Sequence, residues 1–126
     1  MFSWGKDEDF SGVLGLGRVF HQASPTINHG FQEKKIITIS IGEKHAGAID
    51  NRGRVYLWGT GISGELGDVT GKTIWEPKPF KNEENEDYSM NYMFIDCQGN
   101  CTAIVTSKKK KHSSKEKQFL FRSWQS

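Results

Sequence analysis

A glycine-rich segment near the middle of the chain is the first candidate for chemistry. The segment VYLWGTGISGELG, residues 55–67, places Gly59, Gly61 and Gly64 in the GxGxxG spacing of loops that bind a dinucleotide pyrophosphate. Such a loop needs a helix after the glycines, because the N-terminus of that helix holds the phosphates. Further glycines, β-branched residues and prolines follow instead, and they do not favour a helix. We therefore expect no nucleotide and no other cofactor here.

The overlapping segment GDVTGKT, residues 67–73, resembles the end of a phosphate-binding P-loop. The pattern GxxxxGK[ST] requires a glycine at position 66, where the chain has Leu66. Gly67 leaves only three residues before Gly71, and a shorter loop changes which backbone N–H groups meet at the phosphate. The segment therefore does not support a phosphate site.

The two cysteines, Cys97 and Cys101, are too few for a disulfide framework. Residues four apart in an extended strand lie about 13 Å from each other, beyond disulfide reach, unless a turn at Gly99 and Asn100 intervenes. The four histidines show no pair spacing that would complete a zinc site. Packing as small buried side chains is the favoured interpretation, and a metal or redox role is the alternative.

The glycine pattern recurs along the chain, which indicates an internal repeat. Phe2-Ser3-Trp4-Gly5 parallels Tyr56-Leu57-Trp58-Gly59, and Gly12-Val13-Leu14-Gly15 parallels Gly64-Glu65-Leu66-Gly67. A third copy of the first motif ends in Trp124. The repeat units are expected at about 1–54 and 55–118, with the start of a third at 119–126, in one domain over residues 1–126.

Each unit reads as three strands separated by turn residues. The runs of β-branched, aromatic and other apolar residues lie at 36–42, 45–49 and 55–58 and again at 92–97, 101–105 and 119–121. A weaker fourth strand is expected before Pro25 and Pro77. The chain has 14 glycines, and aromatic residues make up 12% of it, which is typical of a globular β protein with one core.

The signature V-Y-x-W-G-x-G-x-x-G-x-L-G at 55–67 resembles the regulator of chromosome condensation repeat. Residues 2–17 match it with an insertion, and Ile-Gly-x-x-His-x-x-Ala-Ile at 41–49 is similar to the middle strands of the same family. The resemblance implies four-stranded blades of a β-propeller that typically has seven. We expect an all-β chain forming a partial β-propeller, with about two four-stranded antiparallel blades plus the opening strand of a third.

The resemblance implies structural roles for the residues of the signature. They are Trp4, Gly5, Gly12, Leu14, Gly15, Gly42, His45, Tyr56, Trp58, Gly59, Gly61, Gly64, Leu66, Gly67 and Trp124. The tryptophans are expected to pack between blades, where the indole N–H finds a partner, with ligand stacking as the alternative. A hydrogen bond within the blade is expected for the histidine, although its ring can also act as an acid or base near neutral pH.

The second unit departs from the first at the histidine. It reads Cys97-Gln98-Gly99-Asn100-Cys101 where the first unit reads Ile41-Gly42-Glu43-Lys44-His45. Alignment from Ala48-Ile49 onto Ala103-Ile104 instead places Asn100 at the position of His45. A second departure is Gln125, which replaces the glycine after the last tryptophan of the repeat.

The charged residues are balanced overall but clustered locally. A net charge of +2 does not by itself indicate nucleic-acid binding. The run Lys108, Lys109, Lys110 and Lys111 is expected in a hairpin-loop insertion at 107–118, either as a solvated loop or as a targeting or binding patch. The acidic residues 82–87 are expected in a surface loop. No apolar stretch of membrane-spanning length and no signal peptide is found, so we expect no membrane and an intracellular setting, in the cytoplasm or nucleus.

The chain is expected not to be an enzyme, because no acid–base pair, nucleophile set or metal set recurs in it. Incomplete sets of blades leave strand edges that invite another chain. The leading function is therefore a non-catalytic protein–protein interaction or scaffold module within a larger propeller or assembly, with contact loops at 6–11, 60–63 and 108–117. The resemblance implies an alternative, a guanine nucleotide exchange factor or chromatin-binding regulator of a small GTPase, with that GTPase or chromatin as the partner.

Overall fold

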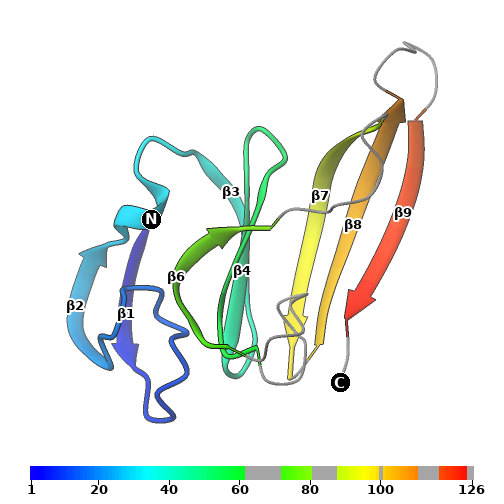
Figure 1. Cartoon of the computed structure of the whole chain (residues 1–126). Coiled ribbons are helices and arrows are strands. Elements are labelled where there is room, and N and C mark those ends of the chain that lie inside the picture. The colour runs from blue at the N-terminus through cyan, green and yellow to red at the C-terminus, as the bar shows by residue number, and fades with distance from the viewer. Residues whose placement is uncertain (62–71, 81–87, 100, 111–116, 125–126) are drawn as a thin grey trace.

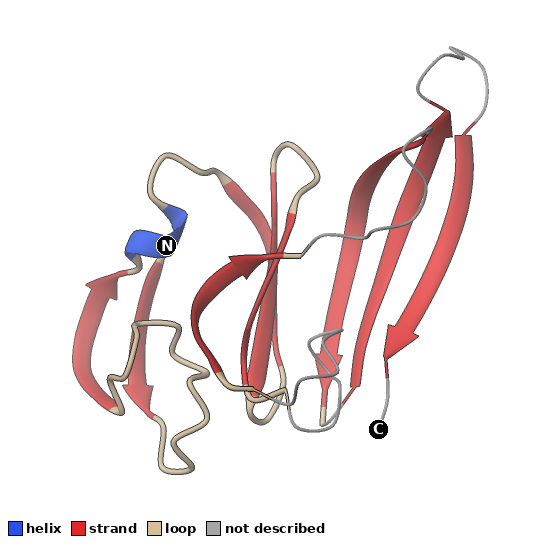
Figure 2. Ribbon diagram, in the orientation of Figure 1, coloured by secondary structure: helices blue, strands red, loops and turns tan. Residues whose placement is uncertain are grey.

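The computed structural model describes residues 1–61, 72–80, 88–99, 101–110 and 117–124, and these are almost entirely β (Figure 2). The strands are β1 (Phe2–Lys6), β2 (His21–Ile27), β3 (Ile36–Ile41), β4 (His45–Asp50), β5 (Val55–Gly59), β6 (Ile74–Pro79), β7 (Tyr88–Gln98), β8 (Cys101–Lys110) and β9 (Lys117–Trp124). One short 3-10 helix, η1 (His29–Phe31), follows β2.

The strands form three antiparallel sheets that stand side by side, in chain order (Figure 1). The first sheet is β1-β2, the middle sheet is β3-β4-β5-β6, and the third sheet is β7-β8-β9. The expectation of an all-β, partial propeller is confirmed. Pro25 and Pro77 lie within β2 and β6 rather than after them; β6 is an edge strand, where a missing N–H is tolerated.

The two central strands of the middle sheet, β4 and β5, are buried on both faces. Val55 and Leu57 of β5 face the third sheet and pack with Tyr92 and Ile95. The intervening Tyr56 and Trp58 pack on the opposite face with Phe31, Ala46 and Ala48, next to the first sheet. Two hydrophobic clusters therefore hold the three sheets together.

The boundaries between the sheets do not coincide with the boundaries of the repeat units expected from the sequence. The expected unit boundary at 54/55 lies in the turn between β4 and β5, inside the middle sheet. The expected loop insertion at 107–118 is wrong for 107–110, because these residues continue β8 and pair with both neighbouring strands. Residues 117 and 118 likewise belong to β9. Lys111 and the acidic run at 82–87 lie outside the described residues.

Asp50 closes the turn between β4 and β5 and predicts a pH dependence. Its buried carboxylate accepts hydrogen bonds from the backbone N–H of Arg52 and Arg54, from Arg54 Nε at 2.8 Å and from the Tyr56 hydroxyl. Burial alone would raise the pKa of Asp50, but these hydrogen bonds outweigh it and hold the pKa below the usual 3.8. The folded state thus favours the charged form, and the stabilisation is complete above pH 3.8 and lost below it.

We expect the Asp50→Asn variant to be less stable than the unsubstituted chain at neutral pH, with the difference shrinking as the pH falls below about 4. Urea unfolding across pH 2.5–7 measures this. A difference that stays constant over that range would contradict the assignment of a charged, hydrogen-bonded Asp50. Asp96, which is only half-buried, offers a matched Asp→Asn control.

Candidate interaction site

Trp58 joins the middle sheet to the first one. Its indole Nε1 donates a hydrogen bond to the carbonyl oxygen of Val13 at 2.8 Å, and its ring lies edge-on to Phe31. Gly15 lets the loop after β1 come this close: its φ is +67°, and a Cβ there would lie 2.9 Å from the indole nitrogen. The Gly12-Val13-Leu14-Gly15 motif thus packs over Trp58 of the middle sheet.

His45 and Ser40 join the middle sheet to the third one. His45 Nε2 lies 2.9 Å from the hydroxyl of Thr102, and both side chains are buried. The backbone N–H of Cys97 donates to Ser40 Oγ at 2.9 Å. The hydrogen bond of the histidine therefore runs between sheets, and not within one blade as expected.

The strand register also settles which residue of the third sheet corresponds to His45. Ala46 pairs with Trp58, and Thr102 pairs with Trp124, so Cys101 occupies the equivalent position. The alignment that placed Asn100 there is wrong by one residue, because it ignored the position of the tryptophan. Both cysteines are thiols, and burial raises the pKa of the Cys97 thiol to about 11.

The loop after β1 presents an aromatic side chain to solvent. Phe10 is 60% exposed and has a φ of +52°, a conformation that costs a non-glycine residue about 1 kcal/mol or more. The loop between the tryptophan and the Gly-x-Leu-Gly motif is two residues longer here than in the second unit, since Gly12 follows Trp4 by eight residues and Gly64 follows Trp58 by six. The ring of Phe10 packs edge-on against Phe20, with the ring centroids 4.7 Å apart, and most of the Phe10 side chain nevertheless stays exposed.

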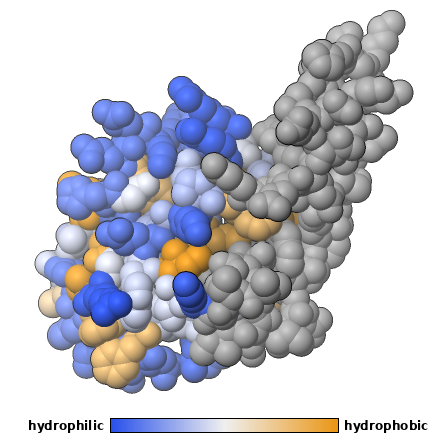
Figure 3. Space-filling model, viewed as in Figure 1, coloured by the Kyte–Doolittle hydropathy of each residue, from blue (hydrophilic) through white to orange (hydrophobic). Residues whose placement is uncertain are grey.

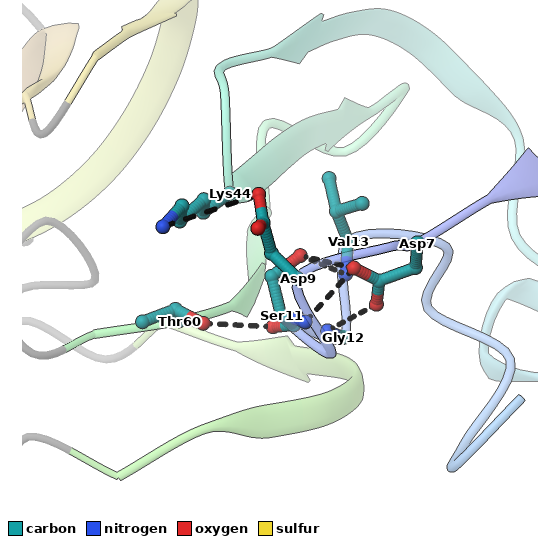
Figure 4. Close-up of polar contacts among 7 residues, drawn as sticks. All are labelled: Asp7, Asp9, Ser11, Gly12, Val13, Lys44 and Thr60. Carbon is teal, nitrogen blue, oxygen red and sulfur yellow. Dashed lines mark hydrogen bonds and ion pairs between the residues drawn. The ribbon is translucent and has the colours of Figure 1, made fainter. Parts of the chain in front are cut away.

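The buried carboxylate of Asp7 holds this loop in place (Figure 4). It accepts hydrogen bonds from the backbone N–H of Ser11 at 2.8 Å, from the Ser11 hydroxyl at 2.8 Å and from the backbone N–H of Gly12 at 2.7 Å. The Thr60 hydroxyl, at the end of β5, donates to the carbonyl oxygen of Ser11 at 3.0 Å. The contact loop, residues 6–13, is thus anchored to two sheets while Phe10 stays outside.

Removal of the Asp7 carboxylate is expected to free the contact loop. The Asp7→Ala variant loses three hydrogen bonds and leaves buried donors without a partner, so the free energy of opening the loop should fall by about 2 kcal/mol. Amide hydrogen exchange at Ser11 and Gly12 measures this. Asp9→Ala is the control: Asp9 is exposed and lies 4.0 Å from Lys44 Nζ, so it should change exchange little. Equal effects of the two variants would contradict the role of Asp7.

The other residues of the repeat signature lie at turns and in the core. Gly5, Gly12 and Gly59 have a positive φ, Leu14 and Gly61 are buried, and Gly42 lies against the ring of His45. Gly64, Leu66 and Gly67 lie outside the described residues, as does the rest of the expected contact loop at 60–63 beyond Gly61. The strand β6, and not a helix, is the next described element after the glycine loop.

Trp4 is the exception among the tryptophans whose side chains are described. It is 57% exposed, whereas Trp58 at the equivalent position of the middle sheet is 1% exposed. Phe2 and Ile27, which pair across β1 and β2, are exposed as well. Apolar side chains reach the surface at several places in the coloured part of Figure 3.

Comparison with known proteins agrees with this architecture. The family model of the regulator of chromosome condensation (RCC1) repeat matches residues 1–49. The chain therefore carries the RCC1 repeat. Human E3 ubiquitin-protein ligase HERC2 is 36% identical over 78 residues, which are 62% of this chain and 2% of HERC2. Human HERC3, a probable E3 ubiquitin-protein ligase, is 30% identical over 106 residues, which are 83% of this chain and 10% of HERC3.

Solved structures of the repeat family share the fold. The structure of Prp20p from Saccharomyces cerevisiae superposes with a TM-score of 0.66 at 22% identity, covering 92% of this chain and 29% of Prp20p. This RCC1-repeat chain therefore spans only a small part of the relatives that it matches. Among the described residues, no helix has the length and apolar character needed to cross a membrane.

Proposed function

We propose that the chain is a non-catalytic protein-interaction module that works as part of a larger propeller or assembly. The contrast between Trp4 and Trp58 carries this proposal. The loop after β1 covers Trp58 and accepts its N–H, whereas the equivalent Trp4 is mostly exposed to solvent. A loop of the Gly-x-Leu-Gly type from a neighbouring blade is the cover that fits Trp4.

Contact with a protein partner is assigned to the contact loop. Asp7 fixes the backbone, and the exposed, strained Phe10 offers an aromatic anchor of the kind enriched at interface centres. Glu8 and Asp9 directly precede Phe10, so a partner surface with an apolar pocket and cationic neighbours is complementary. An intracellular setting, in the cytoplasm or nucleus, is part of the same proposal.

A photo-crosslinking amino acid at position 10 tests the contact loop in cells that express the protein. We expect one adduct of defined mass that disappears when Asp7→Ala is added, because the variant frees the loop. The matched control carries the crosslinker at Gln32, which is exposed but belongs to no repeat motif. No adduct at position 10, or the same adducts from both positions, would overturn the role of the loop.

The alternative function is nucleotide exchange or chromatin binding. Prp20p has been described by its binding properties to Gsp1p and histones. In this chain, three consecutive lysines, Lys108 to Lys110, end strand β8. Salt-sensitive nucleosome binding that weakens in a variant with these lysines changed to glutamine would support chromatin binding. Accelerated nucleotide release from a small GTPase would support the exchange function. The chain spans 2% of HERC2, so ligase activity is not attributed to it.

A further inference from the structure

A row of aromatic rings runs from the contact loop to β6 of the middle sheet. The Phe10 and Phe20 rings meet edge-on with their centroids 4.7 Å apart, and Phe20 meets Trp75 of β6 edge-on at 5.7 Å. The Arg18 guanidinium lies over the Trp75 ring, 5.5 Å from its centroid. We call these four residues the aromatic ridge. It joins the loop of one sheet to a strand of the next.

Backbone contacts hold the aromatic ridge in place. The N–H of Asp7 donates to the carbonyl oxygen of Phe20 at 2.8 Å, which closes the loop after β1 at its base. The N–H of Gly17 donates to the carbonyl oxygen of Trp75 at 3.0 Å, which ties the loop to β6. Gly12 lies so close that a Cβ there would be 3.1 Å from the indole ring of Trp75. A partner therefore meets a preformed surface, which lowers the entropic cost of binding.

The two ends of the aromatic ridge carry opposite charges. Glu8 and Asp9 are exposed and directly precede Phe10, although Asp9 also lies 4.0 Å from Lys44 Nζ. Arg18 at the other end is exposed too, and it forms no ion pair within the part of the chain that the structure describes. A guanidinium stacked on an indole keeps its N–H groups available for a carboxylate. The ridge therefore offers negative charge, aromatic surface and positive charge in that order.

An open groove continues from the Arg18 end along the edge of β6 that faces away from β5. Its volume is about 600 Å³, and it is lined by two members of the ridge and by Pro77 and Pro79. Neither proline has a backbone N–H, so a partner strand cannot form a regular ladder with this edge. Glu76 and Lys78, which alternate with the prolines, also line the groove, and their charges balance. Recognition here therefore depends on side chains and not on strand addition.

We propose that the aromatic ridge binds an extended partner segment whose residues are basic, apolar and acidic in that order. This inference rests on the proposed function of the contact loop and specifies the partner chemistry that the loop selects. The basic residue faces Glu8, the apolar residue packs over Phe10, and the acidic residue pairs with the Arg18 guanidinium. Steps along the ridge measure 4.7–5.7 Å, and an extended chain rises about 3.3 Å per residue, so these contacts fit a short segment.

Two synthetic peptides of the same composition test this order of residues. The first carries two lysines, two leucines and two glutamates in that order, and the second carries the leucines first, then the lysines and the glutamates. We expect the first peptide to bind roughly tenfold more tightly and to shift the NMR signals of Phe10, Arg18 and Trp75. No binding of the first peptide at millimolar concentration, or equal binding of both peptides, would overturn the proposal.

A charge swap tests the contact of Arg18. Arg18→Glu should weaken binding of the first peptide by roughly tenfold, and a peptide with lysines in place of the glutamates should regain it, which also shows that the variant is folded. Lys35→Glu is the matched control, because it makes the same change of charge at an exposed position outside the ridge. Equal weakening by both variants would mean that net charge alone attracts the peptide, and would contradict the role of Arg18.

The outcome can be separated from that of the crosslinking experiment. An adduct at position 10 that persists in Arg18→Glu, together with equal binding of the two peptides, would support the contact loop and overturn the proposed order of charges. Selective binding of the first peptide without any adduct at position 10 would support the aromatic ridge and contradict the role of the contact loop in cells.

Discussion

Replacing Trp58 by alanine is expected to lower the free energy of unfolding of the middle sheet by about 4 kcal/mol. The substitution empties a buried site between the first and middle sheets and leaves the carbonyl oxygen of Val13 without its donor at 2.8 Å. Contact with Phe31 is lost at the same time. Hydrogen exchange of the β4 and β5 amides measures the effect, because it reports local opening as well as global unfolding.

Two further variants assign this loss to its causes. Trp58→Phe retains most of the ring volume and should cost about 1–2 kcal/mol, chiefly through the lost hydrogen bond. Trp4→Ala removes the same residue type from the equivalent but exposed position and should cost no more than about 0.5 kcal/mol. Similar losses for Trp4→Ala and Trp58→Ala would show that Trp4 is already covered in the isolated chain, and would contradict the need for a neighbouring blade.

Replacing Gly59 by alanine is expected to cost about 3 kcal/mol and to disturb the end of β5. Gly59 has a φ of +106°, and a Cβ there would lie 2.5 Å from the carbonyl oxygen of Lys44 and 2.6 Å from the Cα of His45. Both obstacles belong to the backbone, so the strand itself has to move. Urea unfolding with tryptophan fluorescence measures the loss of stability.

Gly99 supplies the control for Gly59. Its φ is also positive, at +50°, but a Cβ there would meet no atom within 4 Å. Gly99→Ala should therefore cost only the backbone strain, about 1 kcal/mol. A smaller loss for Gly59→Ala than for Gly99→Ala would mean that the close approach of β4 and β5 at His45 is not a constraint on the fold.

The repeat made most of the fold predictable from sequence. The spacing of the tryptophans and the Gly-x-Leu-Gly motif led to antiparallel sheets in a partial propeller, as observed. Strand ends were less predictable: Lys108 to Lys110 suggest a loop because of their charge, whereas pairing with both neighbours keeps them in β8. Charged side chains do not prevent strand formation when backbone pairing continues.

The contact loop was only partly predictable. The sequence predicts that loop 6–11 carries contacts. It does not predict the loop conformation, which depends on hydrogen bonds from the backbone N–H groups of Ser11 and Gly12 to the Asp7 carboxylate. Asp is common in loops and turns of many kinds, so the residue type alone does not identify this contact. The aromatic ridge could not be predicted either, because Phe20 and Trp75 are far apart in the sequence and meet only through the packing of two sheets.

Light scattering combined with thermal unfolding of the 126-residue chain tests the central claim most directly, namely that these sheets need completion by a partner. We predict either a mass above the 14.3 kDa of one chain or a monomer that unfolds over a broad range, with the first sheet opening before the middle one. A 14.3 kDa monomer with one sharp transition, in which β1 is as protected as β5, would contradict this claim.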